Sequence, residues 1–356
     1  MIGVQILWLG FFTAFFVVLL ATPSLIKVAK LKHLVDEPSE DRKLHTRSIP
    51  TIGGIVIFGA LLFSYALWFP EEYFYINQSI TIFKTVVAVL VILFFVGIKD
   101  DIIGTAPLKK LAAHFVVGFI IVIMSDIRIR SMYGIFGVGE LELWQSYLIS
   151  IFTYIVIVNA FNLIDGLDGL AAGIGFISTM SIGVLFSVVG NVPLALLGFV
   201  LGGALLGFLI FNFSPARIFM GDSGSLTIGA VVSVLAINAI GVSPASLPLE
   251  VRTVNMPILV MSILAYPLAD TIRAFTIRAF KGVSPFTADK NHIHHKFIAL
   301  GFTHAQTVLV IYFYNLCIIG FALVFPFTNP TLSLLGLVVA ALSIVLVPTI
   351  IKKIKK

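Results

Sequence analysis

The chain has 356 residues, of which 59% are hydrophobic and 11% are charged, and its formal net charge is +6. Soluble domains carry about 25% charged residues, so this composition excludes an ordinary soluble protein and predicts an all-α polytopic membrane protein. The one cysteine, Cys317, cannot form an internal disulfide. Since every polar block is short, residues 1–356 are interpreted as a single integral-membrane domain.

A bilayer core of roughly 30 Å requires about 20 apolar residues per helix. The first apolar segment has no basic region before it and no cleavage site after it, so we expect a retained span rather than a signal peptide. Eleven segments are predicted to cross the membrane: 3–26, 51–69, 81–98, 109–125, 145–161, 171–189, 192–211, 223–241, 255–280, 305–325 and 331–350.

The polar connections alternate between two sides. One side, with the helix ends that border it, holds 19 of the 23 Lys and Arg residues and 11 of the 17 Asp and Glu residues. By the positive-inside rule this side is cytoplasmic, which places the N-terminus outside and the C-terminus in the cytoplasm. No basic soluble face is expected, which argues against nucleic acid as a partner. The cytoplasmic segments are 27–50, 99–108, 162–170, 212–222, 281–304 and 351–356.

On the outer side, residues 126–143 alternate polar and apolar side chains and contain three glycines. This pattern predicts a small external β-hairpin. The polar residues that are unusual for a membrane protein all fall on the cytoplasmic side, which is the main indication of a functional site.

The first cytoplasmic segment is basic and ends in a glycine pair, Gly53-Gly54. Lys43, His45 and Arg47 could draw a phosphorylated ligand to the membrane surface. The alternative is a plain positive-inside anchor.

Asp100 and Asp101 end the third span, with Lys109 and Lys110 shortly after them. Adjacent carboxylates repel each other, which suits one of them to accept a proton. The alternative is a solvated pair at a helix end, with lysines that extend along the membrane surface.

The segment 159–170 connects two long apolar runs. Asn162, Asp165 and Asp168 are spaced by three residues, so on a helix they share one face, and Gly166 and Gly169 leave room for a close approach. Ionisable residues at a bilayer edge are costly and are functional by default. A plain turn between two helices is the alternative.

Two further cytoplasmic segments carry candidate residues. Asp222 precedes a helix, where it serves either as an N-cap or as a ligand for Mg²⁺, and Phe219 either faces lipid or stacks on a base. His292, His294 and His295 form a cluster between lysines, which suits phosphate binding better than zinc because no cysteine joins it.

Together these motifs resemble the polyprenyl-phosphate N-acetylhexosamine-1-phosphate transferases. The resemblance spans nearly the whole chain, from His45–Gly54 and Asp100-Asp101 through Asn159–Leu170 and Phe219–Ser225 to His292–His295. The form His-Ile-His-His is similar to the bacterial undecaprenyl-phosphate GlcNAc-1-phosphate transferase branch.

The resemblance implies the reaction of UDP-GlcNAc with undecaprenyl phosphate to give GlcNAc-diphosphoundecaprenol and UMP. It implies Mg²⁺, with Mn²⁺ as an alternative, at the cytoplasmic face of the bacterial plasma membrane, and it is compatible with a homodimer. By motif position, Asn162 and Asp222 would hold the metal, and Asp100 would deprotonate or orient the lipid phosphate with Asp101 in support. Donor-contacting roles would fall to Asp165, Asp168, Lys110, Asn212, Phe219, His292, His294 and His295, and more loosely to Arg47.

Three alternatives stay open at the level of sequence. The same chemistry could act on another UDP-N-acetylhexosamine or on UDP-MurNAc-pentapeptide. The attack could be direct or pass through a covalent phospho-enzyme. A lipid or solute transporter would place charges near mid-membrane, and Asp270 is the one candidate for such a charge in this chain. Its position before Arg273 and Arg278 suggests instead the cytoplasmic end of a broken helix.

Overall fold

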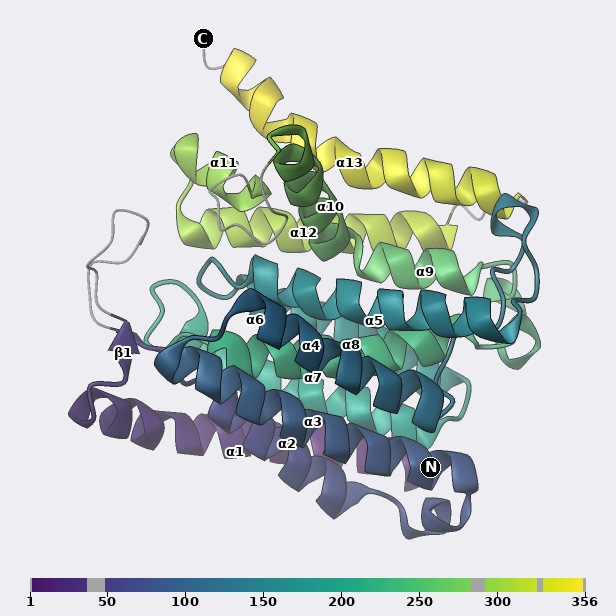
Figure 1. The fold of residues 1–356 in the computed structure, drawn as a ribbon, viewed down its shortest axis with the longest axis horizontal. Helices are drawn as coiled ribbons and strands as arrows, with labels where there is room; N and C mark the ends of the chain where they lie inside the picture. Colours follow the sequence, from purple (N-terminus) through teal and green to yellow (C-terminus); the bar gives the residue numbers. More distant parts are fainter. Residues whose placement is uncertain (1, 37–48, 283–291, 325–328, 355–356) are drawn as a thin grey trace.

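The computed structural model describes residues 2–36, 49–282, 292–324 and 329–354, which form a bundle of roughly aligned helices (Figure 1). Two short strands, β1 (Val35–Asp36) and β2 (Ile49–Pro50), pair antiparallel beside the bundle. The helices are α1 (Ile2–Leu31), α2 (Gly54–Trp68), α3 (Asn77–Ile103), α4 (Pro107–Phe119), α5 (Leu143–Ile164), α6 (Leu170–Val188), α7 (Val192–Asn212), α8 (Gly221–Ile240), α9 (Met256–Ile263), α10 (Ala265–Phe280), α11 (Ile293–Ala299), α12 (His304–Val324) and α13 (Pro330–Ile354).

The all-α membrane architecture is confirmed. Among the described residues, nine helices are long and apolar enough to span a membrane, and the bent pair α9–α10 would make a tenth. Helix α2 is apolar but has only 15 residues. The predicted number of eleven therefore requires both α2 and the bent pair to cross. Helix α1 begins and α13 ends at opposite ends of the bundle (Figure 1), as an odd number of crossings demands.

Helix α8 lies at the centre of the bundle. In its most apolar window 94% of the residues are buried inside the protein, against 28% for α1 and 17% for α13. Helices α2, α3, α5 and α6 all pack against α8. Because the central helix has neighbours on every side, the residues at its first turn can meet side chains from several other helices.

The predicted span over 255–280 is not one continuous helix, because the chain bends by 75° between α9 and α10. Pro267 has no N–H, so the carbonyl of Ile263 loses the partner it would have in a continuous helix. The side chain of Asn315 on α12 replaces this bond. Its Nδ2 donates to Ile263 O at 3.0 Å, and its Oδ1 accepts from the N–H of Tyr266 at 3.1 Å. A buried amide thus satisfies the backbone groups that the break exposes.

The predicted β-hairpin over 126–143 is confirmed only in outline. The chain folds back and forms one isolated antiparallel bridge between Ser131 and Glu140, but no strand is formed in this segment. Its tip is a short 3-10 turn at Ile135–Gly137, where Gly134 and Gly137 both have positive φ. The two arms are joined by backbone bonds from Leu141 N–H to Arg130 O at 2.8 Å and from Met132 N–H to Gly139 O at 2.9 Å, and the glycines then turn the chain.

Candidate active site

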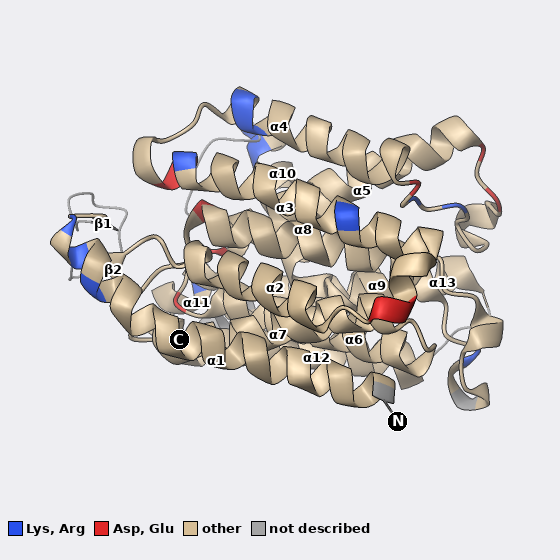
Figure 2. Ribbon diagram, turned by 90° about the horizontal axis from the view of Figure 1, so that it is seen from below, with Lys and Arg blue, Asp and Glu red and all other residues tan. Residues whose placement is uncertain are grey.

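Charged residues gather mainly toward the two ends of the helices, and most of the length of the bundle is uncharged (Figure 2). At one end, α3 finishes, α4 begins, α5 finishes and α8 begins. Those candidate residues that the structure describes lie at this end, which we call the site end.

The start of α8 is held by a carboxylate from another helix. Asp101 at the end of α3 accepts hydrogen bonds from the N–H of Asp222 at 2.6 Å and from the N–H and Oγ of Ser223 at 3.1 and 2.7 Å. The first N–H groups of a helix have no partner within it and favour negative charge. Asp101 therefore caps α8 and fixes the backbone from which Asp222 projects.

Close packing of glycines brings the three helices together at this point. A Cβ atom on Gly54 would lie 2.1 Å from the backbone N of Gly224, and one on Gly97 would lie 2.4 Å from the Cα of Ser223. The glycine pair before α2 and the glycine near the end of α3 thus allow both helices to touch the first turn of α8. Without this approach Asp101 could not reach its partners.

Gly221 is the most constrained of these glycines, and its replacement by alanine is expected to destabilise the protein. Its φ is +70°, and an added Cβ would lie 2.3 Å from the carbonyl oxygen of Thr51 and 2.7 Å from Oδ1 of Asp101. The left-handed conformation alone costs about 1–2 kcal/mol for a residue with a side chain. We expect Gly221→Ala to lower the thermal unfolding midpoint in detergent and to reduce turnover.

The matched control is Gly139→Ala in the loop at the other end, where no atom lies within 4 Å of the added Cβ and φ is not left-handed. This variant should unfold like the unmodified protein. Equal midpoints for the two variants would contradict the role assigned to Gly221.

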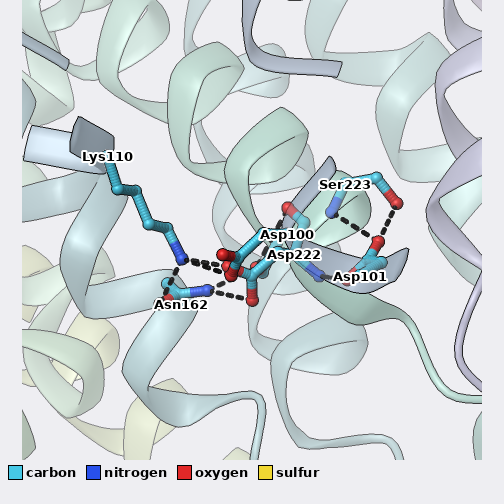
Figure 3. Close-up of polar contacts among 7 residues, drawn as sticks. Asp100, Asp101, Lys110, Asn162, Asp222 and Ser223 are labelled. Carbon is cyan, nitrogen blue, oxygen red and sulfur yellow. Dashed lines mark hydrogen bonds and ion pairs between the residues drawn. The ribbon is translucent and has the colours of Figure 1, made fainter. Parts of the chain in front are cut away.

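Beside the cap, four side chains from four helices form a polar cluster, the Lys110 cluster: Asp100, Lys110, Asn162 and Asp222 (Figure 3). Lys110 forms an ion pair with Asp222 and lies 3.5 Å from Oδ2 of Asp100 and 3.4 Å from Oδ1 of Asn162. Asn162 donates through Nδ2 to Asp222 at 2.9 Å and to Ser225 Oγ at 3.0 Å. The side chains of Lys110, Asp100 and Asp222 are 17%, 21% and 23% exposed, so the cluster is open to a ligand.

Asp165, at the end of α5, adds another carboxylate to this region. Burial raises its pKa well above the usual range, and the charges of Asp222 and Asp101 raise it further. Asp100, Asp101 and Asp165 thus all lie within electrostatic reach of Asp222, and Lys110 pairs with Asp100 and Asp222. This excess of negative charge favours the binding of an additional cation.

The donor set suits a hard divalent ion. Carboxylate and amide oxygens are the ligands that Mg²⁺ prefers, and Mg²⁺ is commonly held by one or two carboxylates together with substrate phosphates and water. Within the described part of the chain no three His, Cys, Asp or Glu side chains converge as a preformed metal cage. Asp222 and Asn162 fit the predicted open site, and Lys110 lies against the oxygens that such an ion would contact.

Asp168 and Asn212 make their contacts outside the Lys110 cluster. Asp168 Oδ2 accepts from the N–H of Ala216 at 3.2 Å and lies 3.5 Å from Nδ1 of His304. Burial tends to raise the pKa of Asp168, but the bonds from His304 and Ala216 outweigh it and hold that pKa below its usual value. Asn212 is only 3% exposed. Its Oδ1 accepts a hydrogen bond from the N–H of Gly169, and its Nδ2 donates one to the carbonyl of Ile218. These contacts tie the 165–169 turn to the loop before α8.

The three histidines lie at the start of α11. His292 and His294 are buried and stack with their rings 5.4 Å apart and 7° from parallel, while His295 is partly exposed. Burial lowers the pKa of His294 to about 3, so its imidazole is neutral at neutral pH. Nε2 of His294 lies 3.2 Å from the position of a Cβ on Gly166, which places the histidines beside the 165–169 turn.

Phe219 lies in the loop before α8, and its backbone pairs with the segment before α2. Its N–H donates to Pro50 O at 2.7 Å and its carbonyl accepts from Gly53 N–H at 3.0 Å. The predicted stacking on a base stays a prediction. Lys43, His45 and Arg47 lie outside the described residues.

The structure therefore joins Asp100, Lys110, Asn162 and Asp222 directly, as residues from one site should be, and gives Asp101 a separate contact with the α8 backbone. Sequence reasoning did not select Ser223, Ser225 and His304, which bond Asp101, Asn162 and Asp168. The small-residue pattern of residues 221–225 and the position of His304 at a helix start were the only signals for them.

An apolar cavity of about 640 Å³ lies between α5, α9 and α10. Leu111, the neighbour of Lys110, lines it near the site end, and Ile135 and Phe136 line it near the other end. The cavity therefore runs along the bundle from the level of Leu111 toward the opposite end, and no residue of the Lys110 cluster lines it.

An apolar helix bundle with carboxylates, a lysine and histidines gathered at one end defines a polytopic membrane enzyme. Residues 83–240 match the sequence model of the family described as glycosyl transferase family 4. The chain is 32% identical over 305 residues to a probable undecaprenyl-phosphate N-acetylglucosaminyl 1-phosphate transferase of Bacillus subtilis, covering 85% of this chain and 80% of the relative.

Two further relatives agree. A decaprenyl-phosphate N-acetylglucosaminephosphotransferase of Mycobacterium tuberculosis is 33% identical, with 84% of this chain and 78% of the relative covered. An undecaprenyl-phosphate alpha-N-acetylglucosaminyl 1-phosphate transferase of Yersinia pestis is 31% identical, with 80% and 75% covered. The chain belongs to glycosyl transferase family 4, which confirms the family resemblance and the transferase class.

Proposed function

We propose that this protein transfers GlcNAc-1-phosphate from UDP-GlcNAc to undecaprenyl phosphate, giving GlcNAc-diphosphoundecaprenol and UMP. The substrates named for the relatives support the donor and acceptor. The observation that carries the proposal is the Lys110 cluster, which holds carboxylate, amide and ammonium groups at the end of an apolar bundle. Such a reaction would be the first membrane step of a cell-envelope glycan pathway.

Phosphoryl transfer depends on positioning and on neutralising charge. Asp222 and Asn162 would hold Mg²⁺ or Mn²⁺, and the ion would neutralise the diphosphate of the donor. Lys110, which reaches three members of the cluster, would neutralise a phosphate of the donor or acceptor. Asp100, unlike Asp101, does not cap α8, so its carboxylate would orient the attacking oxygen of the lipid phosphate or accept its proton.

The other substrate contacts follow from the positions of the remaining groups. His292, His294 and His295 would contact the phosphates or the sugar, beside the 165–169 turn. Asp165, Asp168 and Phe219 would serve the nucleotide region, and Asn212 would support it by joining its two loops.

The apolar cavity is the proposed site for the polyprenyl chain. Its lining is almost wholly hydrocarbon, and it includes Leu111, the residue that follows Lys110 in the chain. An acceptor whose tail occupies the cavity would have its phosphate at the Lys110 cluster. We also infer that the site end faces the cytoplasm of a bacterium across its plasma membrane, because most of the Lys and Arg residues lie there.

The proposal is tested by incubating the purified full-length protein in detergent with UDP-GlcNAc, undecaprenyl phosphate and Mg²⁺ and measuring UMP. Release of UMP that requires both substrates is expected. A parallel series with UDP-GalNAc and UDP-MurNAc-pentapeptide determines the donor. Faster UMP release from either of these would overturn UDP-GlcNAc as the substrate while keeping the reaction class.

Removal of the divalent ion is expected to stop turnover, because Asp222 and Asn162 alone leave the diphosphate charge uncompensated. Excess EDTA should reduce UMP release to background, and Mg²⁺ or Mn²⁺ added beyond the chelator should restore it. Calcium-saturated EDTA serves as the control for effects of the chelator itself. Full turnover in metal-free buffer would refute the metal role.

A further inference from the structure

Helix α10 contributes two side chains that hold the histidine cluster, and neither belongs to the sites assigned above. Tyr266 and Asp270 are four residues apart and therefore lie on one face of the helix. Tyr266 Oη lies 3.3 Å from Nδ1 of His294, and Asp270 Oδ2 lies 2.7 Å from Nδ1 of His292. Both imidazoles are thus held through the same ring nitrogen by one helix.

Asp270 is completely buried, with 0% exposure. A buried carboxylate is costly unless its oxygens are bonded, and here both are used. Oδ2 faces His292, and Oδ1 accepts from the N–H of Ile293 at 2.7 Å. The carboxylate therefore contacts both the ring of His292 and the first turn of α11.

The contact fixes which nitrogen of His292 carries the proton. An ionised carboxylate only accepts hydrogen bonds, so Nδ1 of His292 must be the donor. Nε2 is then available on the side of the ring turned away from α10. The ring of His294 is parallel to it within 7°, and its Nε2 approaches Gly166 in the turn that carries Asp165 and Asp168.

We propose that Asp270 is a positioning residue that acts through His292. By keeping one proton on Nδ1 it leaves Nε2 to take up a second proton, and the imidazolium, which Asp270 stabilises, then donates from Nε2 to a substrate phosphate. This role rests on the proposed function, because it requires a phosphorylated substrate at the site end. When His292 is protonated, Nε2 donates to phosphate and Asp270 stabilises the imidazolium. When it is neutral with its proton on Nδ1, Nε2 carries the lone pair and does not donate to phosphate. Tyr266 holds the ring of His294 through Nδ1 at 3.3 Å, but its hydroxyl can either donate or accept and so orients this ring without fixing its tautomer.

A purely structural role is the competing explanation, since Asp270 also bonds the backbone of α11. Asp270→Asn separates the two. The amide oxygen can still accept from Ile293 N–H, but the amide N–H₂ now faces Nδ1 of His292. Nδ1 must then accept, which moves the ring proton to Nε2. The start of α11 is preserved while the tautomer is reversed.

Turnover in a double-mutant cycle tests the proposal. We expect Asp270→Asn to lower kcat by about 10- to 100-fold, the scale for groups that orient a functional histidine. Asp270→Asn added to His292→Asn should cause no further loss, since the residue through which it acts is gone. Tyr266→Phe is the matched control, because it acts through His294 and its effect should persist in the His292→Asn background.

A spectroscopic measurement gives a readout that does not depend on turnover. The ¹⁵N spectrum of histidine-labelled full-length protein, with His292 assigned by comparison with His292→Asn, should show a protonated Nδ1. In Asp270→Asn the proton should appear on Nε2. If that variant does not fold, the spectrum of the unmodified protein still decides, since a neutral His292 with its proton on Nε2 overturns the proposal.

The outcomes separate this inference from the proposed function. Normal turnover in Asp270→Asn, or an equal loss with and without His292, would overturn the role of Asp270 and leave the transferase reaction intact. An unmodified protein that releases no UMP from any UDP-sugar would instead overturn the proposed function.

Discussion

Replacing Asp222 with alanine is expected to reduce kcat by about 10²- to 10⁴-fold, equivalent to roughly 3–5 kcal/mol of transition-state stabilisation. Asp222 is the residue on which the cluster converges, because both Lys110 and Asn162 bond its carboxylate. Its loss removes the proposed metal ligand and leaves the ammonium group of Lys110 without its closest partner. UMP release at saturating substrate, measured across a titration of Mg²⁺, checks the result.

Two variants make this test specific. Asp222→Asn can keep the bond to Asn162 but removes the negative charge of the proposed metal ligand, so it should also be defective and should require more Mg²⁺. Glu72→Ala changes an exposed carboxylate in the turn Glu71–Tyr75 before α3, at the end of the bundle away from the site, and should turn over normally. Near-normal kcat for Asp222→Ala in a protein that keeps its unfolding midpoint would refute the assignment.

The positions of the helices follow from hydropathy because the lipid forces every buried backbone group to bond within a helix. The exception is instructive. The run 255–280 is apolar enough for one span, yet the chain breaks between α9 and α10. Pro267 signals a missing bond, but the group that compensates for it, Asn315, lies 52 residues from Ile263. A break of this kind depends on a partner that local sequence does not identify.

In the candidate site, too, some contacts could be predicted from the sequence and others could not. The shared cytoplasmic side and the family resemblance predicted that Asp100, Lys110, Asn162 and Asp222 belong together, and the contacts agree. Spacing could not predict that Asp101 caps another helix, because that contact depends on how closely α3 approaches α8. Gly97 permits the approach, and a glycine in a membrane helix has too many other uses to reveal it.

The pairing of Asp168 with His304 was equally inaccessible from sequence, because 136 positions separate the two residues and neither lies in the other's motif. Asn212 was predicted to face substrate, whereas its amide joins two loops inside the protein. Polar side chains that connect loops resemble substrate ligands in sequence, since both are buried amides or carboxylates near a site.

Asp100 and Asp101 are adjacent in sequence but are expected to respond in opposite ways to replacement by asparagine. Successive residues on a helix point about 100° apart, and here Asp100 faces Lys110 while Asp101 faces the backbone of α8. Asp100→Asn should lower kcat by about 10²- to 10³-fold, because it removes the group proposed to orient or deprotonate the lipid phosphate. Its unfolding midpoint should be unchanged or higher, since one of the mutually repelling carboxylates is gone.

Asp101→Asn should instead lower the free energy of unfolding by about 1–2 kcal/mol, because it weakens a helix cap and removes a charge that the helix dipole favours. Its loss of turnover should be smaller and should follow from the displacement of Asp222. Paired measurements of kcat and of the thermal unfolding midpoint for the two variants test this division. The opposite result would be an Asp101→Asn variant that is less active and more stable than Asp100→Asn. In that case Asp101 would not stabilise the start of α8, and the proposed base would be Asp101 rather than Asp100.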